Sequence, residues 1–255
     1  MPTAARAALL LAMLSALRCG LASAAHPLVT EDTGTQKKNN FQLELNAESS
    51  RDHDGNVLTR GFQPAAVLAY GLLDNLDLQI GRSYLRQVAD PEGSNDVVKG
   101  GLDTSIDLKW RFFESGDVSI GLKPGITLAT GDEQRGLGSG KATLGGLLIG
   151  SWETEGYAVH AHAGWRQNNN SIGQRRHIMQ LAAAAVLKAS AESRLILDLS
   201  RTTNPDRASS TPIRYLTLGY IVSPRENIDL DIGWRRAASA PALDHALMLG
   251  ATLRW

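Results

Sequence analysis

The stretch Leu102–Phe112, with the sequence LDTSIDLKWRF, alternates apolar and polar residues, with Thr104 as a mild exception. Successive side chains of a β-strand point to opposite faces, so this spacing places Ile106, Leu108 and Trp110 on one face and the charges between them on the other. An α-helix would not separate the two sets in this strictly alternating way. The stretch therefore predicts a half-buried strand.

The same alternation recurs along the chain, for example in residues 41–48, 76–81 and 228–235. About twelve such segments are expected, near 40–50, 61–70, 76–85, 101–112, 118–130, 141–152, 157–166, 176–188, 194–201, 212–221, 228–235 and 245–255. The Ala182–Ala185 run alternates poorly and would suit a helix on propensity alone.

The connections between these segments alternate in length. Short turns, such as 71–75, are followed by longer polar loops, such as 86–100 and 131–140. Outer-membrane barrels have this rhythm, and strands of up to about eleven residues suit a tilted membrane crossing. We predict an all-β fold, an up-and-down antiparallel transmembrane β-barrel of about 12 strands, in residues 40–255. The alternative is a soluble barrel with a polar outside and an apolar core.

The first 25 residues are expected to be a signal peptide. Arg6 precedes the apolar stretch Ala7–Leu17, which is too short to span a bilayer, and small residues follow at 22–25. The alternative is an N-terminal membrane anchor. Residues 26–39 are predicted to form a polar periplasmic N-terminal segment, and the location is predicted to be the cell outer membrane.

The total charge excludes a large basic surface for nucleic acid. Lys+Arg and Asp+Glu both number 26, and removal of Arg6 and Arg18 leaves 24 basic against 26 acidic residues, a net charge of about −2. The single cysteine, Cys19, falls within the predicted signal peptide, so no disulfide is expected in the mature chain.

Alternation also sorts the side chains of the predicted wall into two faces. The predicted lumen-lining residues are Glu44, Asp77, Asp107, Lys109, Arg111, Lys123, His160, His162, Asp198, Asp229 and Asp231, with Glu48, Arg235 and Arg254 as further inward charges. The predicted lipid-facing residues are Leu76, Leu78, Ile80, Ile106, Leu108, Trp110, Val118, Ile120, Leu122, Leu195, Leu197, Leu199 and Leu249. Aromatic residues fall near the ends of the strands, as in the interfacial girdles of membrane barrels.

The chain ends on an aromatic residue that closes an alternating strand. Leu249, Ala251, Leu253 and Trp255 share one face, and this pattern resembles the terminal signal by which bacterial outer-membrane barrels are recognised for assembly. The alternative is an ordinary edge strand that stops on Trp.

No enzymatic motif is found. Ser119 and Ser171 each precede Ile-Gly, but neither has the glycine two residues earlier that a nucleophile elbow needs. His160 and His162 point the same way, yet a metal site needs further ligands that the sequence does not locate. We therefore expect no enzyme, no metal and no cofactor, and interpret the two histidines as part of the polar lumen.

Several stretches resemble the outer-membrane β-barrel transporter family named for the meta-pathway of phenol degradation. They are His26–Gln36, Tyr70–Leu78, Gly100–Asp103, Leu108–Phe112, Leu122–Ile126, Ala129–Asp132 and His160–Trp165, where Asn is more usual than His162. The resemblance covers the whole predicted mature chain, rests on the order of the motifs, and implies fold and location more firmly than substrate.

These observations predict a narrow channel for passive uptake of small compounds, aromatic or apolar ones among them. The alternative is a non-conducting structural or adhesive outer-membrane barrel. Expected partners are outer-membrane lipid, the barrel assembly machinery and a small-molecule permeant, with no nucleic acid.

Overall fold

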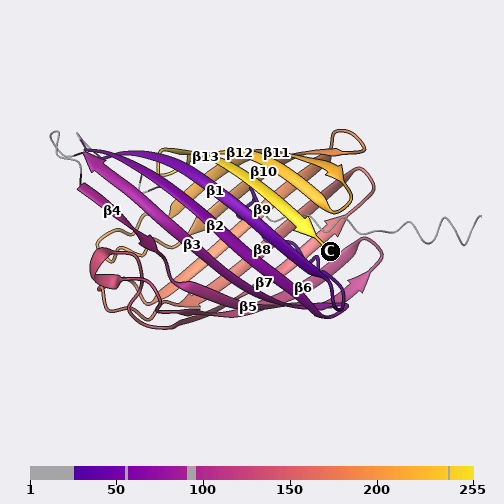
Figure 1. Ribbon diagram of the computed structural model, residues 1–255, viewed down its shortest axis with the longest axis horizontal. Coiled ribbons are helices and arrows are strands. Elements are labelled where there is room, and N and C mark those ends of the chain that lie inside the picture. The colour runs from indigo at the N-terminus through magenta and orange to yellow at the C-terminus, as the bar shows by residue number, and fades with distance from the viewer. Residues whose placement is uncertain (1–25, 55–56, 91–95, 241) are drawn as a thin grey trace, which may run out of the picture.

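The computed structural model describes residues 26–54, 57–90, 96–240 and 242–255, which form a closed antiparallel β-barrel (Figure 1). The predicted signal peptide, residues 1–25, lies outside the described residues. Among the described residues, no helix is long and apolar enough to cross a membrane.

Thirteen strands and one short helical turn make up the described chain. The strands are β1 (Phe41–Asp54), β2 (Val57–Leu73), β3 (Leu76–Asp90), β4 (Asp96–Gly101), β5 (Thr104–Ser115), β6 (Val118–Leu128), β7 (Thr143–Glu153), β8 (Tyr157–Gln167), β9 (His177–Lys188), β10 (Ser193–Thr202), β11 (Ile213–Arg225), β12 (Ile228–Ala237) and β13 (His245–Arg254). The 3₁₀ turn η1 (Glu133–Arg135) lies in the loop between β6 and β7.

Except for β4 and β5, which do not pair with each other, strands that are neighbours in sequence are paired, and the pairing of β1 with β13 closes the ring. Both β4 and β5 pair with β3, one after the other along its length, so thirteen strands occupy twelve positions. The predicted twelve-stranded up-and-down barrel is therefore confirmed.

Strands β1, β2 and β3 run several residues further than predicted at the end with the longer loops, which we call the loop end. The predicted loop 86–100 is mostly strand, because β3 continues to Asp90 and β4 begins at Asp96. The first hairpin likewise extends to Asp54 and Val57. Antiparallel pairing can continue beyond the apolar belt of the wall. There both faces of a strand meet water, so the alternation of apolar and polar residues that predicts a strand is lost.

Two prolines inside strands sit where the ladder is interrupted. Gln63 and Pro64 have no partners on β3, and Pro124 has none on β5. Proline has no backbone N–H and cannot donate to a strand ladder. Each gap therefore falls where the proline has no hydrogen bond to donate.

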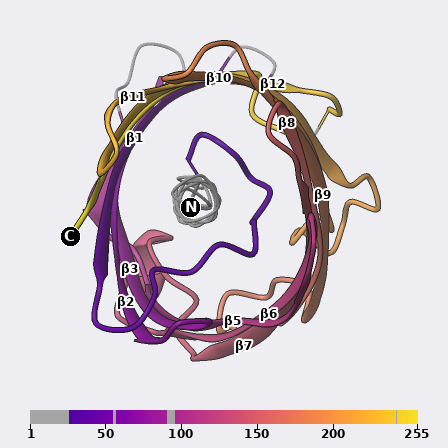
Figure 2. The same ribbon diagram turned by 90° about the vertical axis from the view of Figure 1, so that its right-hand side faces the viewer.

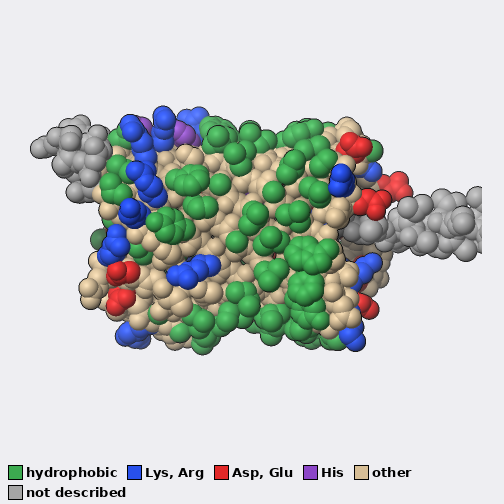
Figure 3. All heavy atoms as spheres, in the orientation of Figure 1, with side chains coloured by type: hydrophobic (Ala, Val, Ile, Leu, Met, Phe, Trp, Pro, Cys, Tyr) green, Lys and Arg blue, Asp and Glu red, His purple; other side chains and the backbone are tan. Residues whose placement is uncertain are grey.

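The outer face of the wall is apolar over most of its height (Figure 3). Leu148, Leu199 and Leu249 are 53%, 55% and 52% exposed, whereas in water most such surface would be buried. Aromatic rings lie near the turns, with Trp152 against Tyr157 and Phe41 against Trp255. This surface is typical of a barrel that is surrounded by lipid.

Candidate functional site inside the barrel

Residues 26–39, which we call the inner segment, precede β1, and their part up to Gln36 runs inside the barrel (Figure 2). Thr30, Asp32 and Thr33 are no more than 2% exposed. The sequence analysis placed this segment in the periplasm as a polar N-terminal stretch. In the structure its residues up to Gln36 lie within the barrel, a position that the sequence analysis did not predict, because the inner face of the wall supplies partners for their backbone and side chains.

Two lysines of the wall hold the acidic pair of the inner segment. Lys109 Nζ lies 3.0 Å from Glu31 Oε1 and 2.7 Å from Asp32 Oδ1, and Lys123 Nζ lies 2.7 Å from Glu31 Oε2. Burial alone would raise the pKa of Glu31, but the charges of Lys123 and Lys109 and their hydrogen bonds hold it below its usual value. Buried charges are tolerated in this way only when they are paired.

Two wall carboxylates accept hydrogen bonds from the backbone of the inner segment. Asp198 accepts from the N–H groups of Val29 and Thr30, at 3.1 and 2.8 Å. Asp77 accepts from the N–H of Gln36 with both oxygens, at 3.1 and 3.0 Å. Both carboxylates are fully buried, and each satisfies backbone groups that have no strand partner.

Hydroxyl and imidazole groups complete the contacts around the middle of the segment. The N–H of Glu31 donates to His162 Nδ1 at 3.0 Å, and the N–H of Thr33 donates to Ser151 Oγ at 3.2 Å. His160 Nδ1 lies 2.9 Å from the same Ser151 oxygen. Among the described residues, no three His, Cys, Asp or Glu side chains form a group that could hold a metal. Through its hydrogen bond His162 positions the segment directly, and His160 does so through Ser151.

The first residues of the segment pack on an apolar part of the wall. Leu28 contacts the cluster formed by Ala184, Val186, Ile196 and Ile221. Pro27 covers two wall glycines, where an added Cβ would come within 2.6 Å of its ring. His26 Nδ1 lies 2.5 Å from Asp231 Oδ1. The wall is thus shaped to receive this end of the segment.

Other predicted lumen residues lie on the inner face without touching the segment. Asp229 pairs with Arg194 and Arg254, at 3.1 and 2.9 Å, and Arg111 Nε lies 3.3 Å from Glu114. Glu44 accepts from the amide of Gln42 at 2.7 Å. These groups form separate clusters within the wall.

A polar cavity of about 230 Å³ lies on the inner face of the wall, next to the contacts of the inner segment. Asp107, Lys123, Arg166, Gln180 and Thr143 contribute to its lining. Lys123 therefore faces both this cavity and Glu31 of the inner segment. The lining of the cavity therefore carries charges of both signs.

The carboxy-terminal residues face outward where the ring closes. Leu249 and Leu253 are 52% and 36% exposed, and Ala251 lies on the same face. Trp255 exchanges backbone hydrogen bonds with Phe41, at 2.8 and 3.1 Å, and their rings stack. The role of these residues as an assembly signal stays a prediction.

Sequence reasoning missed the partners within the inner segment, chiefly Glu31 and Asp32, and the wall hydroxyls Ser119 and Ser151. The adjacent acids Glu31 and Asp32 could have indicated these contacts, because the predicted inner face carries the basic residues Lys109 and Lys123. It also missed Asp103, which accepts from the N–H groups of Gly131 and Ser139 and so fixes the loop before β7.

Neither a family profile nor a curated protein matches this sequence. Solved structures do match. The COG4313 outer membrane channel from Pseudomonas putida F1 superposes with a TM-score of 0.72 at 14% identity, over 88% of this chain and 98% of that one. The NanC porin gives 0.57 at 6% identity, and the KdgM porin in complex with disordered oligogalacturonate gives 0.56 at 8%, each over 83% of this chain and 98% of the other.

At these identities the similarity establishes the fold. The chain has the closed twelve-stranded barrel fold seen in outer-membrane channels. The three proteins are described as a channel and as porins, not as enzymes.

Proposed function

We propose that this protein is an outer-membrane channel for small compounds in which the inner segment narrows the path. The observation that carries the proposal is a buried polar segment beside a polar interior cavity, both inside a closed barrel. The similarity to barrels described as channels and porins supports it. Export through a cleaved signal peptide and insertion by the barrel assembly machinery belong to the same proposal.

The outer-membrane location is supported by the exposed apolar wall and the aromatic residues near the turns (Figure 3). The protein is expected to fractionate with outer membranes and to show heat-modifiable mobility on a gel. Recovery as a soluble periplasmic protein would contradict the location.

The class of permeant is a finer proposal. The sequence analysis includes aromatic or apolar compounds among the expected permeants, but the apolar patch of the inner wall is covered by Leu28. The cavity that the inner segment leaves is polar, with Asp107, Lys123 and Arg166 among its lining residues. We therefore propose small compounds that carry a charged or hydrogen-bonding group, including aromatic acids and amines.

A non-conducting barrel is the second candidate, because the inner segment itself occupies the interior. The two candidates differ in single-channel conductance in a planar bilayer. We expect the wild-type protein to conduct weakly and Lys109→Met, which leaves Glu31 and Asp32 short of a partner, to conduct several-fold more. Lys141→Met, at an exposed loop position, is the matched control and should conduct like the wild type.

The result separates the two functions. Conductance by the wild type that rises in Lys109→Met alone supports a channel narrowed by the inner segment. Absence of conductance in all three proteins, each inserted and folded, would favour the structural barrel.

A further inference from the structure

The outer face of the barrel carries an arc of cations near the loop end, which we call the basic arc. Its members are Arg51, Arg60, Arg86, Lys99, Arg201, Arg214 and Arg236, all exposed, on β1, β2, β3, β4, β10, β11 and β12. Figure 3 shows Lys and Arg side chains gathered along this end of the visible face. The arc borders the apolar part of the wall rather than the tips of the loops.

The strand register places members of the basic arc directly opposite one another. Arg51 is opposite Arg60, and Arg201 is opposite Arg214. Arg86 is opposite Lys99. Like charges in directly opposed positions destabilise a sheet, so three such pairs are a cost unless an anion lies between them.

The described part of the chain supplies no such anion. Its ion pairs include none of the seven cations. Asp244, the acid near Arg51, pairs instead with His53 at 2.7 Å. By contrast, exposed acids such as Glu155, Glu192 and Glu226 lie at the opposite end, among the short turns.

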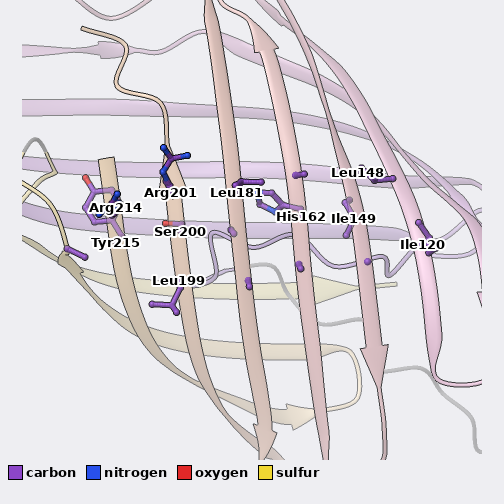
Figure 4. Close-up of a pocket in the computed structure, with 16 residues that line it drawn as sticks. Ile120, Leu148, Ile149, His162, Leu181, Leu199, Ser200, Arg201, Arg214 and Tyr215 are labelled. Atoms are coloured by element: carbon purple, nitrogen blue, oxygen red, sulfur yellow. The ribbon is translucent and has the colours of Figure 1, made fainter. Parts of the chain in front are cut away.

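An apolar groove of about 720 Å³ adjoins two members of the basic arc (Figure 4). Small outward-facing residues form its floor, and Leu148, Leu181 and Leu199, which are 53%, 46% and 55% exposed, stand around it. The floor residues are Gly150, Ala161, Ala163 and Ala183. Arg201 and Arg214 lie side by side at one end, so a long apolar group in the groove would bring its polar end to them.

We propose that the basic arc and this groove bind a phosphate-bearing glycolipid of the leaflet at the loop end. Its acyl chains lie in the groove, and its phosphates lie between Arg201 and Arg214. The planar guanidinium group matches phosphate oxygens with paired hydrogen bonds. A lipid fits better than a free anion because the arginines adjoin apolar surface. The inference rests on the proposed outer-membrane location.

The test measures binding to the full-length mature protein in detergent by native mass spectrometry. The probes are diphosphorylated lipid A, the same lipid without its phosphates, and inorganic phosphate. We expect retention of the diphosphorylated lipid only. Basic residues near an anionic lipid surface contribute about 1 kcal/mol each, so Arg201→Gln with Arg214→Gln should weaken binding about 30-fold.

The matched control replaces two exposed cations at the end of the barrel opposite the loop end, Lys188→Gln with Arg225→Gln. It should bind like the wild type. Heat-modifiable mobility confirms that each variant is folded. Equal retention of the dephosphorylated lipid, or equal binding by the Arg201 and Arg214 variant, would overturn the proposal, as would binding of inorganic phosphate alone. Channel conductance is measured separately, so failure here leaves the proposed channel function standing.

Discussion

On the inner face of β5, Lys109 is 5% exposed and binds two carboxylates of the inner segment, whereas Leu108, beside it on the outer face, is 41% exposed. The cations of the outer face, in the basic arc, have no such partner among the described residues. The chain thus neutralises Lys109 and Lys123 of its inner face with its own N-terminal residues. We propose that a lipid of the membrane neutralises the basic arc instead.

The largest expected effect concerns the inner face. Removing one partner of a buried ion pair costs about 3–5 kcal/mol, so Lys109→Met should favour release of the inner segment by roughly two orders of magnitude or more. Thr30 is 1% exposed. In a Thr30→Cys variant, the rate of reaction with a water-soluble thiol reagent therefore measures release of the inner segment. Labelling that is equally slow with and without Lys109 would show that the lysine does not hold the segment.

The second prediction compares the two faces within one strand. Ile106 lies on the outer face and Asp107 on the inner face beside the cavity. Ile106→Arg should cost about 2–4 kcal/mol at the middle of a bilayer. Asp107→Asn should leave the free energy of unfolding nearly unchanged. Denaturant titrations in lipid would measure both, and the reverse order would mean that the faces are assigned wrongly.

The wall itself could be predicted because a strand exposes its faces with period two. Leu108 and Lys109 were assigned to opposite faces from that period alone. Ala182–Ala185 suited a helix by propensity, yet these residues lie in β9, where Ala184 makes room for Leu28. Tertiary packing decided the structure there.

The partners of the inner face could not be predicted in the same way. Alternation assigns Asp77 and Asp198 to a face, but it carries no information about what fills the interior. Both carboxylates bind backbone N–H groups, which every residue has and no sequence pattern marks. The inner segment was therefore placed in the periplasm.

A third prediction concerns two tryptophans of the outer face. Trp255 is 61% exposed and Trp165 is 43% exposed, so both can anchor at an interface. If the terminal residue is also an assembly signal, Trp255→Ser should lower the amount of barrel in the outer membrane several-fold more than Trp165→Ser. Equal surface levels of the two variants would remove that role from the terminus.

The smallest expected effect is a dependence on pH. The pKa of Glu31 is lowered from an ordinary value of 4.5, so its contribution to holding the segment is complete above about that pH and is lost as the pH falls further. Wild-type conductance should rise as the bath is acidified below this value. Glu31→Gln should lack the part of the rise in conductance that comes from protonation of Glu31. Identical pH profiles of conductance in the wild type and this variant would exclude Glu31 as the source of the rise.

The central claim, that the inner segment narrows the barrel, is tested most directly by a cross-link. The hydroxyl oxygens of Thr33 and Ser119 lie 2.6 Å apart, so Thr33→Cys with Ser119→Cys should form a disulfide on oxidation. In single-channel recordings, Lys109→Met should raise the conductance of this protein when it is reduced and not when it is oxidised. A higher conductance with the cross-link intact would contradict the claim.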